Sequence, residues 1–254
     1  MRIKYYVLNP NGNITALVTS KVAPEQYSRI SAKIMEKDKS VEQVGYVDFN
    51  TNPPYLRMSG GEFCGNGVMS AAVLYYYLQN SDNYVYLNMY GSPAPFKNEI
   101  LNIGSAFTCK SSFDYVNDFC IKSFDFEGQK FSLPYVRMDG ISHIILENSF
   151  DRNLAKRVIA DLCKTLKLSA LGFLFFDNKS GSLEPLVYVE KENTLFYENS
   201  CGSGSVALCS YLSNGKDFLV SLKQPGGIIN AQKSGNNIIL TQDIKIVGEF
   251  EEEF

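Results

Sequence analysis

Hydrophobic and polar positions along the 254-residue chain predict two kinds of element. Residues 24–37 and 151–168 place apolar side chains at helical spacing, and Asp151 is a suitable N-cap for the second helix. Residues 44–49 and 171–177 are short apolar runs rich in β-branched and aromatic side chains, which predicts buried strands. Further strands are expected within residues 83–91, 99–107, 185–198 (a hairpin) and 217–242.

Two other segments, 63–78 and 200–212, share one arrangement of residues. Each contains a cysteine, then Gly-x-Gly, then small and apolar residues. Residues 68–78 are apolar on almost every side, so we expect a helix enclosed by sheet rather than one on the surface. The two cysteines, Cys64 and Cys201, would therefore lie at helix N-termini.

The same order of elements occurs twice along the chain. The extended runs are 127 residues apart (171 − 44), and the cysteine helices are 137 residues apart (201 − 64). Such a repeat predicts two pseudo-symmetric halves, residues 1–125 and 126–254, packed face to face with a cleft between them. The expected fold class is α+β, in which each half is a curved, mostly antiparallel sheet around a central helix.

Composition narrows the class of protein further. Apolar residues make up 45% of the chain, which is enough for a sizeable core, and the formal charge is −3 with a pI near 5.4. This balance argues against nucleic acid or an anionic membrane as a partner. The N-terminus lacks the apolar region of a signal peptide, and no run reaches the roughly 18 apolar residues of a membrane span. We therefore expect a cytoplasmic protein with reduced thiols.

The metal-ligating residue types give no zinc or histidine-cluster signal. None of the six cysteines forms a CxxC pair, and His143 is the only histidine. We expect neither a metal nor another cofactor. Four cysteines are not followed by Gly-x-Gly at a predicted helix N-terminus, so we assign them no catalytic role: Cys109, Cys120, Cys163 and Cys209.

A cysteine at a helix N-terminus has a specific chemical use. The free N–H groups and the partial positive charge of the first turn stabilise a thiolate and can bind a carboxylate. Two such helices facing each other would hold one carboxylate between them, with a sulfur on each side of the neighbouring carbon. One thiolate would remove the α-proton and one thiol would return a proton from the opposite face. We expect the N–H groups to stabilise the enolate-like charge and both thiols to have lowered pKa values.

Other functions remain open on these residues. Both cysteines could be small buried hydrophobic residues, although the repeated setting argues against this. In a cysteine hydrolase, Cys64 or Cys201 would be the nucleophile and His143 the base. The cysteine at the other helix N-terminus would then have no role. A non-catalytic amino-acid-binding module and a phenazine-biosynthesis-type isomerase are further alternatives. The Gly-x-Gly segments do not complete a dinucleotide or phosphate motif.

The cysteine segments "GGEFCGNGVMSAA" and "ENSCGSGSVAL" resemble the two catalytic motifs of the diaminopimelate epimerase superfamily, whose members racemise amino acids without a cofactor. The resemblance extends to "NPNGN", "VEQVGY" and "QPGGII", in the same order along most of the chain. Within the superfamily the chain is most similar to the histidine racemases of opine-type metallophore biosynthesis. The family's arginine before the second cysteine is missing, and Ile141 replaces an asparagine. Both differences favour a substrate with a single amino-acid centre, although another substrate such as diaminopimelate remains an alternative.

The resemblance implies roles for individual residues. Cys64 and Cys201 would be the two acid/base groups. Glu42 would accept an imidazole N–H or position the substrate side chain, and Glu198 and Asn199 would hold the α-ammonium group. The carboxylate-binding set is Gly65, Asn66, Gly202 and Ser203, and Asn13 and Gln43 complete the substrate site. The expected partner is a small-molecule amino-acid substrate, and a homodimer is the assembly considered.

Overall fold

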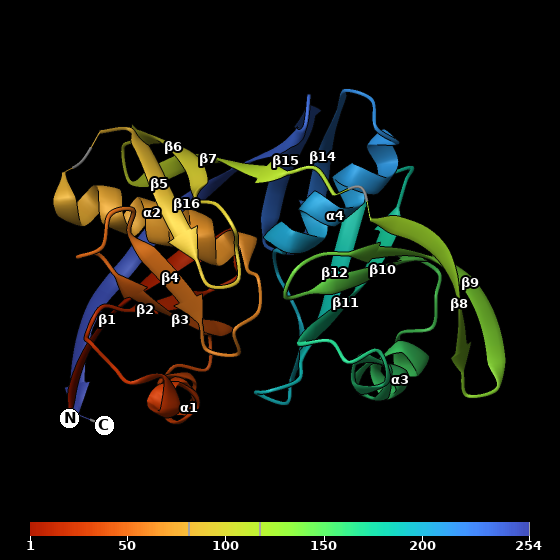
Figure 1. Ribbon diagram of the computed structural model, residues 1–254, viewed down its shortest axis with the longest axis horizontal. Coiled ribbons are helices and arrows are strands. Elements are labelled where there is room, and N and C mark those ends of the chain that lie inside the picture. Colours follow the sequence, from red (N-terminus) through yellow and green to blue (C-terminus); the bar gives the residue numbers. More distant parts are fainter. Residues whose placement is uncertain (81, 117, 254) are drawn as a thin grey trace.

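The computed structural model describes residues 1–80, 82–116 and 118–253. It is dominated by strands and contains four α-helices among these residues (Figure 1). The helices are α1 (Tyr27–Lys37), α2 (Gly65–Gln79), α3 (Arg152–Thr165) and α4 (Gly202–Ser213), and the 3-10 helix Pro24–Gln26 precedes α1. The strands are β1 (Arg2–Pro10), β2 (Thr15–Val18), β3 (Gln43–Asp48), β4 (Tyr55–Met58), β5 (Tyr84–Met89), β6 (Phe96–Ile103), β7 (Ala106–Asp114), β8 (Phe119–Phe126), β9 (Gln129–Arg137), β10 (Ser142–Glu147), β11 (Ala170–Asp177), β12 (Ser182–Val189), β13 (Thr194–Tyr197), β14 (Phe218–Gln224), β15 (Gly227–Ser234) and β16 (Asn237–Glu253).

The predicted elements agree well with these bounds. The first amphipathic segment forms α1 with its preceding 3-10 turn, and the second forms α3. The Asp151 carboxylate accepts a 2.8 Å hydrogen bond from the Asn153 N–H, which confirms the predicted N-cap. The apolar runs form β3 and β11, and β12 pairs with β13 as the expected hairpin. The α+β class is therefore confirmed.

The strands form one continuous hydrogen-bonded sheet with a closed part. The order β1-β2-β3-β4-β5-β6-β7-β16 returns to its start because β16 pairs with both β7 and β1. This ring surrounds α2, whose residues are all buried from Gly65 to Leu74 (Figure 1). Helix α2 is therefore enclosed over this length, as its apolar circumference predicted, whereas Tyr77 and Leu78 in its last turn are exposed.

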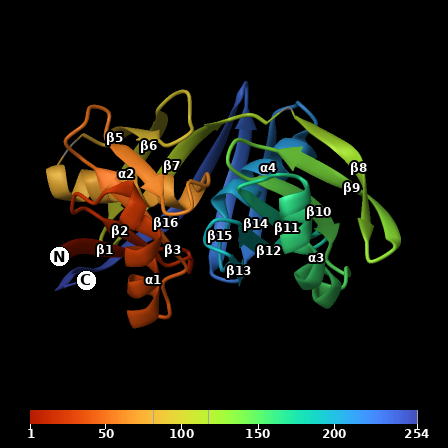
Figure 2. The same ribbon diagram turned by 60° about the horizontal axis from the view of Figure 1, so that its bottom comes forward.

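From β16 the sheet continues through β15, β14, β12, β11, β10, β9 and β8. Helix α4 packs against β14, β15 and β16 on one side and against β10 and β11 on another. The β8–β9 hairpin contains residues 125 and 126, on either side of the expected division of the chain. Strand β16 runs back beside the N-terminus, as both views show (Figures 1 and 2).

The hydrophobic core extends across the molecule instead of stopping between the two helices. One cluster combines side chains of α2, such as Leu74, with side chains of α4, such as Leu208. Separate clusters lie beneath α1, around Ile34, and beneath α3, around Ile159. Each fully buried aliphatic side chain contributes roughly 1.5–3 kcal/mol to folding, so this shared core holds the N-termini of α2 and α4 in a fixed relation.

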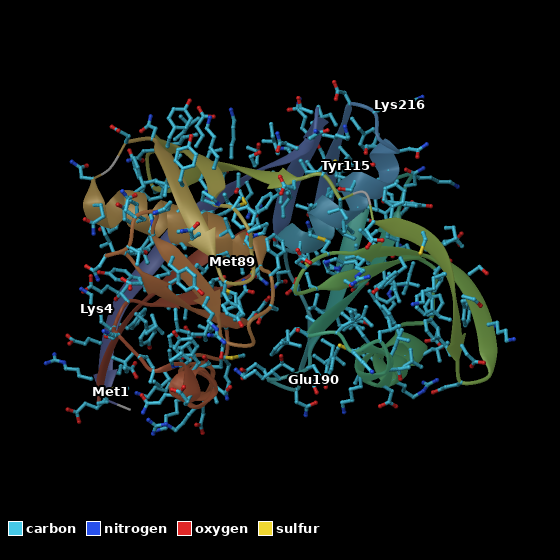
Figure 3. All side chains as sticks on the ribbon, viewed as in Figure 1. Met1, Lys4, Met89, Tyr115, Glu190 and Lys216 are labelled. Carbon is cyan, nitrogen blue, oxygen red and sulfur yellow. The ribbon has the colours of Figure 1, made fainter. Side chains whose placement is uncertain are left out.

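The turn between β12 and β13 reaches across to the elements of the N-terminal region. Glu190, labelled in Figure 3, lies at the start of this turn. Glu192 accepts hydrogen bonds from Ser28 on α1 (2.8 Å) and from Ser59 after β4 (3.1 Å). These contacts join the β12–β13 turn to α1 and to the segment after β4.

Candidate active site

Cys64 and Cys201 occupy equivalent positions at the N-termini of α2 and α4. Each is the N-cap of its helix, and the two cysteines have nearly the same backbone angles, φ −136° and ψ 106° against φ −130° and ψ 106°. The Cys64 sulfur accepts from the Gly67 N–H at 3.1 Å, and the Cys201 sulfur accepts from the Gly204 N–H at 3.3 Å. The three residues around each cap specify this local structure, which is why the sequence pattern predicted it.

The two helix N-termini meet at their first glycines. A Cβ atom on Gly65 would lie 3.1 Å from the Gly202 Cα, and one on Gly202 would lie 2.9 Å from the Asn66 backbone nitrogen. Such contacts leave no room for a side chain at either glycine, so backbone meets backbone. The Asn66 Nδ2 also donates to the Ser200 carbonyl oxygen at 2.8 Å and ties the two segments together.

Both cysteines line one cavity of about 420 Å³. Its wall is formed by both cysteine segments, by the segment before β3 and by β12. The expected site residues on this wall are Glu42, Gln43, Cys64, Gly65, Asn66, Glu198, Cys201, Gly202 and Ser203. The opposed positive ends of two helices at one cavity form a site suited to a carboxylate.

Asn13 and Asn199 contact the site through Glu42. The Asn13 Nδ2 donates to one Glu42 oxygen at 2.8 Å, and the Asn199 Nδ2 donates to the other at 2.7 Å. Burial raises the pKa of Glu42, and these two hydrogen bonds act in the opposite direction. The two asparagines therefore orient a carboxylate at the cavity wall.

The environments of the two sulfurs differ. The Cys64 thiol donates to the Gln43 Oε1 at 3.1 Å. Cys201 is only 3% exposed and lies 3.5 Å from the Ser203 hydroxyl. The Ser203 hydroxyl in turn lies 3.2 Å from the His143 Nε2.

The expectation of lowered thiol pKa values is wrong. Burial raises the pKa of both Cys64 and Cys201 well above the usual value, and the negative charge of Glu198 adds to the effect. The N–H groups of Gly67 and Gly204 lower the thiol pKa values, but by less than burial raises them. A positive charge brought in by a ligand would favour the thiolates.

Two further carboxyl groups face the same cavity. Burial raises the pKa of Glu198 to about 8 and that of Glu62 to about 7. The Glu62 Oε2 is inaccessible to solvent and has no hydrogen-bond partner among the described residues. Sequence reasoning missed Glu62, and its position two residues before Cys64 was the available signal. The cavity thus offers acidic groups to a cationic ligand.

Three more polar side chains contact the N-terminal segments of α2 and α4, and for two of them, Gln224 and Gln242, the sequence predicted no role in the site. The Gln224 Oε1 accepts from the Cys201 N–H at 2.7 Å. The Gln242 Nε2 donates to the Asn66 Oδ1 at 2.9 Å, from strand β16. Burial lowers the pKa of His143 to about 3, so its imidazole is neutral at physiological pH.

Within residues 1–80, 82–116 and 118–253, no three His, Cys, Asp or Glu side chains are grouped so that they could hold a metal ion. No helix in this part of the chain has the length and apolar character needed to span a membrane.

Comparisons with known proteins agree with this arrangement. The family model described as the histidine racemase CntK N-terminal domain matches residues 2–251. The histidine racemase of Fusobacterium nucleatum is 28% identical over 258 residues, covering 97% of this chain and 95% of that protein. The histidine racemase of Staphylococcus aureus is 27% identical over 254 residues, covering 89% of this chain and 87% of that protein.

Solved structures show the same fold at low sequence identity. A predicted epimerase from Pseudomonas aeruginosa has a TM-score of 0.72 at 12% identity, with 99% of both chains covered. A probable proline racemase from Agrobacterium radiobacter has a TM-score of 0.60 at 12% identity, covering 99% of this chain and 92% of that one. Fold and relatives together define the class: the protein is an isomerase of the racemase and epimerase type. Within this class, the chain belongs to the histidine racemase family.

Proposed function

We propose that the protein interconverts L- and D-histidine without a cofactor, by a two-base mechanism at the α-carbon. The observation that supports it most directly is the backbone contact between Gly65 and Gly202, which brings two cysteine-capped helix N-termini to one cavity. The substrate carboxylate binds at these N-termini, at Gly65, Asn66, Gly202 and Ser203. The α-carbon then lies between the Cys64 and Cys201 sulfurs.

The reaction needs one thiolate and one thiol. The thiolate takes the α-proton, so that the Cα–H bond breaks, an S–H bond forms and the electron pair moves onto the carboxylate as an enolate. The thiol on the opposite face then gives its proton to the α-carbon. The helix N–H groups stabilise the negative charge on the carboxylate oxygens while it develops.

The acidic groups of the cavity fit the positive charge of the substrate. Glu198, with Asn199, holds the α-ammonium group, and Glu42 accepts an imidazole N–H from the side chain. Asn13 orients Glu42, since its amide donates to that carboxylate. The bound ammonium group also favours thiolate formation, because it offsets the effects of burial and of Glu198.

Histidine fits this site better than diaminopimelate does. The Fusobacterium and Staphylococcus relatives are both named histidine racemases. Among the described residues lining the cavity there is no arginine for a second carboxylate. The hydrolase alternative is weaker, because His143 contacts the Ser203 hydroxyl and not a sulfur.

We also propose that the chain is organised as two pseudo-symmetric halves, residues 1–125 and 126–254, with β16 crossing back to complete the first. Supporting this, both cysteine helices have N-caps of the same conformation and end at asparagines in the left-handed region, Asn80 (φ 49°) and Asn214 (φ 45°). We propose the cytoplasm as the location of the protein. We also propose that it assembles as a homodimer, which a molecular mass from light scattering would test.

The experiment that tests the function is a panel of L-amino acids incubated with the enzyme in D2O and followed by NMR. We expect L-histidine to lose its α-proton signal and to form D-histidine, with little exchange in the other amino acids. Cys64→Ser and Cys201→Ser should each abolish racemisation, and Cys120→Ser, at an exposed cysteine, is the matched control. Normal racemisation by Cys64→Ser would contradict the mechanism, and an inactive wild type would contradict the function.

A further inference from the structure

We propose that Glu62 recognises the side chain of the substrate by binding the imidazole nitrogen that Glu42 leaves free. Glu62 is then a specificity-determining residue, which selects a ring with two nitrogens over a ring of similar size without them. This inference rests on the proposed function, in which Glu42 accepts one imidazole N–H. It is carried by a carboxyl group that lines the cavity and has an oxygen without a partner among the described residues.

Glu62 reaches the cavity because the chain turns sharply after β4. The Gly61 N–H donates to the Met58 carbonyl oxygen at 3.0 Å, and the φ of Gly61 is 82°, in the region that favours glycine. After this turn the Glu62 side chain lies against Gly60. A Cβ atom on Gly60 would be 2.5 Å from the Glu62 Oε2 and 2.7 Å from the Val189 Cγ1. The two glycines therefore make room for a carboxyl group beside strand β12.

Glu42 and Glu62 lie on neighbouring segments of one cavity wall. Strands β3 and β4 are antiparallel neighbours, and the Ser59 N–H continues their pairing by donating to the Val44 carbonyl oxygen at 3.0 Å. Glu42 comes two residues before Val44, and Glu62 comes three residues after Ser59. Both glutamates line the same cavity. A substrate side chain that extends along this wall therefore meets two carboxyl groups.

The hydrogen bonding of Glu62 fits a ligand-binding role better than a structural one. Each Glu42 oxygen accepts a hydrogen bond from an asparagine amide, so that carboxylate is held in place before a ligand arrives. The Glu62 Oε2 is inaccessible to solvent and has no such partner among the described residues. A buried polar atom without a partner is unfavourable. A ligand that makes a hydrogen bond to this carboxyl group therefore gains affinity.

The proton affinity of Glu62 matches that of an imidazole. Burial raises the pKa of Glu62 to about 7, and the charge of Glu192 adds to the rise, while Lys191 and nearby backbone N–H groups oppose it. The ordinary pKa of a histidine side chain is about 6.5. One proton can therefore lie on either partner, as O–H···N to a neutral ring or as O⁻···H–N⁺ to an imidazolium. In both forms the ring keeps its other N–H for Glu42.

Glu198, and not Glu62, is the carboxyl group placed for the α-ammonium group. The charge of Glu198 raises the pKa of both Cys64 and Cys201, and a hydrogen bond to Glu198 also raises that of Cys201. Glu198 therefore lies beside the reacting carbon. The charge of Glu62 raises the pKa of Cys64 by less than that of Glu198 does. Glu62 lies against Gly60, farther along the wall, where the side chain of the substrate extends.

The test compares L-histidine with L-β-thienylalanine, whose five-membered ring contains no nitrogen. Racemisation gives kcat and KM, and calorimetry gives dissociation constants in the Cys64→Ser background, where turnover is stopped. In Glu62→Leu we expect the preference for histidine, as the ratio of the two dissociation constants, to fall about ten- to a hundredfold, because the carboxyl group contacts only the ring nitrogen. The loss of racemisation should be mainly in KM. Glu62→Gln can still donate to a ring nitrogen and should keep most of the preference.

A gain of affinity separates recognition from a loosened site. Methylation of one ring nitrogen blocks the contact with Glu62, and methylation of the other blocks the contact with Glu42. Glu62→Ala leaves room for a methyl group, so it should bind one of the two N-methyl-L-histidines more tightly than wild type does, and not the other. Glu25→Leu, at an exposed position just before α1, is the control and should match wild type with every ligand.

An unchanged preference for histidine in Glu62→Leu would overturn the inference. So would an equal loss of affinity for histidine and thienylalanine, since that pattern indicates a contact with the α-ammonium group or a role in the fold. A Glu62→Ala variant that gains affinity for neither methylhistidine, or for both, would also overturn it.

The dissociation constants are measured without turnover, so they are independent of the proposed function. If the preference falls in Glu62→Leu as expected but wild type does not racemise histidine, only the function is lost. If wild type racemises histidine while Glu62→Leu keeps the preference, only the role of Glu62 is lost.

Discussion

Gly65 and Gly202, from helices 137 residues apart in the sequence (202 − 65), touch each other through backbone atoms alone. The contact brings two helix N-termini to one point, so that their free N–H groups and partial positive charges act on the same ligand. It also sets the relation between the two N-cap cysteines, because each sulfur is held by an N–H group of its own first turn.

Replacing either glycine by alanine should separate the helix mouths. A Cβ on Gly202 would lie 2.9 Å from the Asn66 nitrogen, a distance that only a backbone shift can relieve. We expect Gly65→Ala and Gly202→Ala each to lower the free energy of unfolding by about 1–3 kcal/mol. Histidine racemisation should fall at least about a hundredfold, since small misplacements of reacting groups are costly. Denaturant unfolding and a racemisation assay measure the two effects, with Gln79→Ala as the control. Wild-type activity in both variants would show that the contact is not needed.

The buried carboxyl groups should make the enzyme less stable at alkaline pH. The pKa values of Glu62 and Glu198 rise from the ordinary 4.5 to about 7 and about 8. Between pH 4.5 and 8 the folded state therefore binds more protons than the unfolded state, and the free energy of unfolding falls as pH rises. Glu198→Gln should remove part of this slope and stabilise the protein by about 1–3 kcal/mol at pH 9. Thermal unfolding at pH 5 and pH 9 is the measurement, and an unchanged slope would contradict the burial of this charge.

His143 should influence racemisation without titrating. Burial lowers its pKa to about 3, so it is neutral wherever the enzyme works. His143→Leu removes the partner of Ser203 and should lower the rate by about ten- to a hundredfold, without shifting the acid limb of the pH profile. His143→Gln can still donate to Ser203 and should retain most of the activity. Loss of all activity in both variants, with unfolding temperatures unchanged, would favour a general base.

The proposed mechanism needs neither a metal nor an organic cofactor. Racemisation should therefore survive dialysis against a strong chelator, and the purified active enzyme should show no visible absorbance. Activity restored only by a divalent cation after dialysis would require a different account of how the enolate is stabilised.

Local signals in the sequence predicted the elements that local interactions decide. The Asp151 cap and the two cysteine caps each depend on a few neighbouring residues, and all three form as expected. The apolar circumference of residues 68–78 predicted an enclosed helix for the same reason: a helix with no polar face must be covered on all sides.

Long-range pairings could not be read from these signals. Strand β16 completes the ring around α2 by pairing with β1 and β7, although most of the chain lies between it and β1. Its Gln242 supports Asn66, and the β12–β13 turn delivers Glu192 to α1. Alternation of apolar residues marks a strand, but it does not name that strand's neighbours.

Cysteine position and cysteine ionisation were decided at different levels of structure. The sequence alone determined that Cys64 and Cys201 begin two buried helices, because capping and apolar spacing are properties of a dozen consecutive residues. Only the tertiary structure decided what surrounds each sulfur. Burial and Glu198 raise both thiol pKa values, while Gln43 contacts the Cys64 sulfur and Ser203 contacts the Cys201 sulfur. The reason is physical: desolvation and charge depend on everything within a few ångströms, whichever part of the chain supplies it.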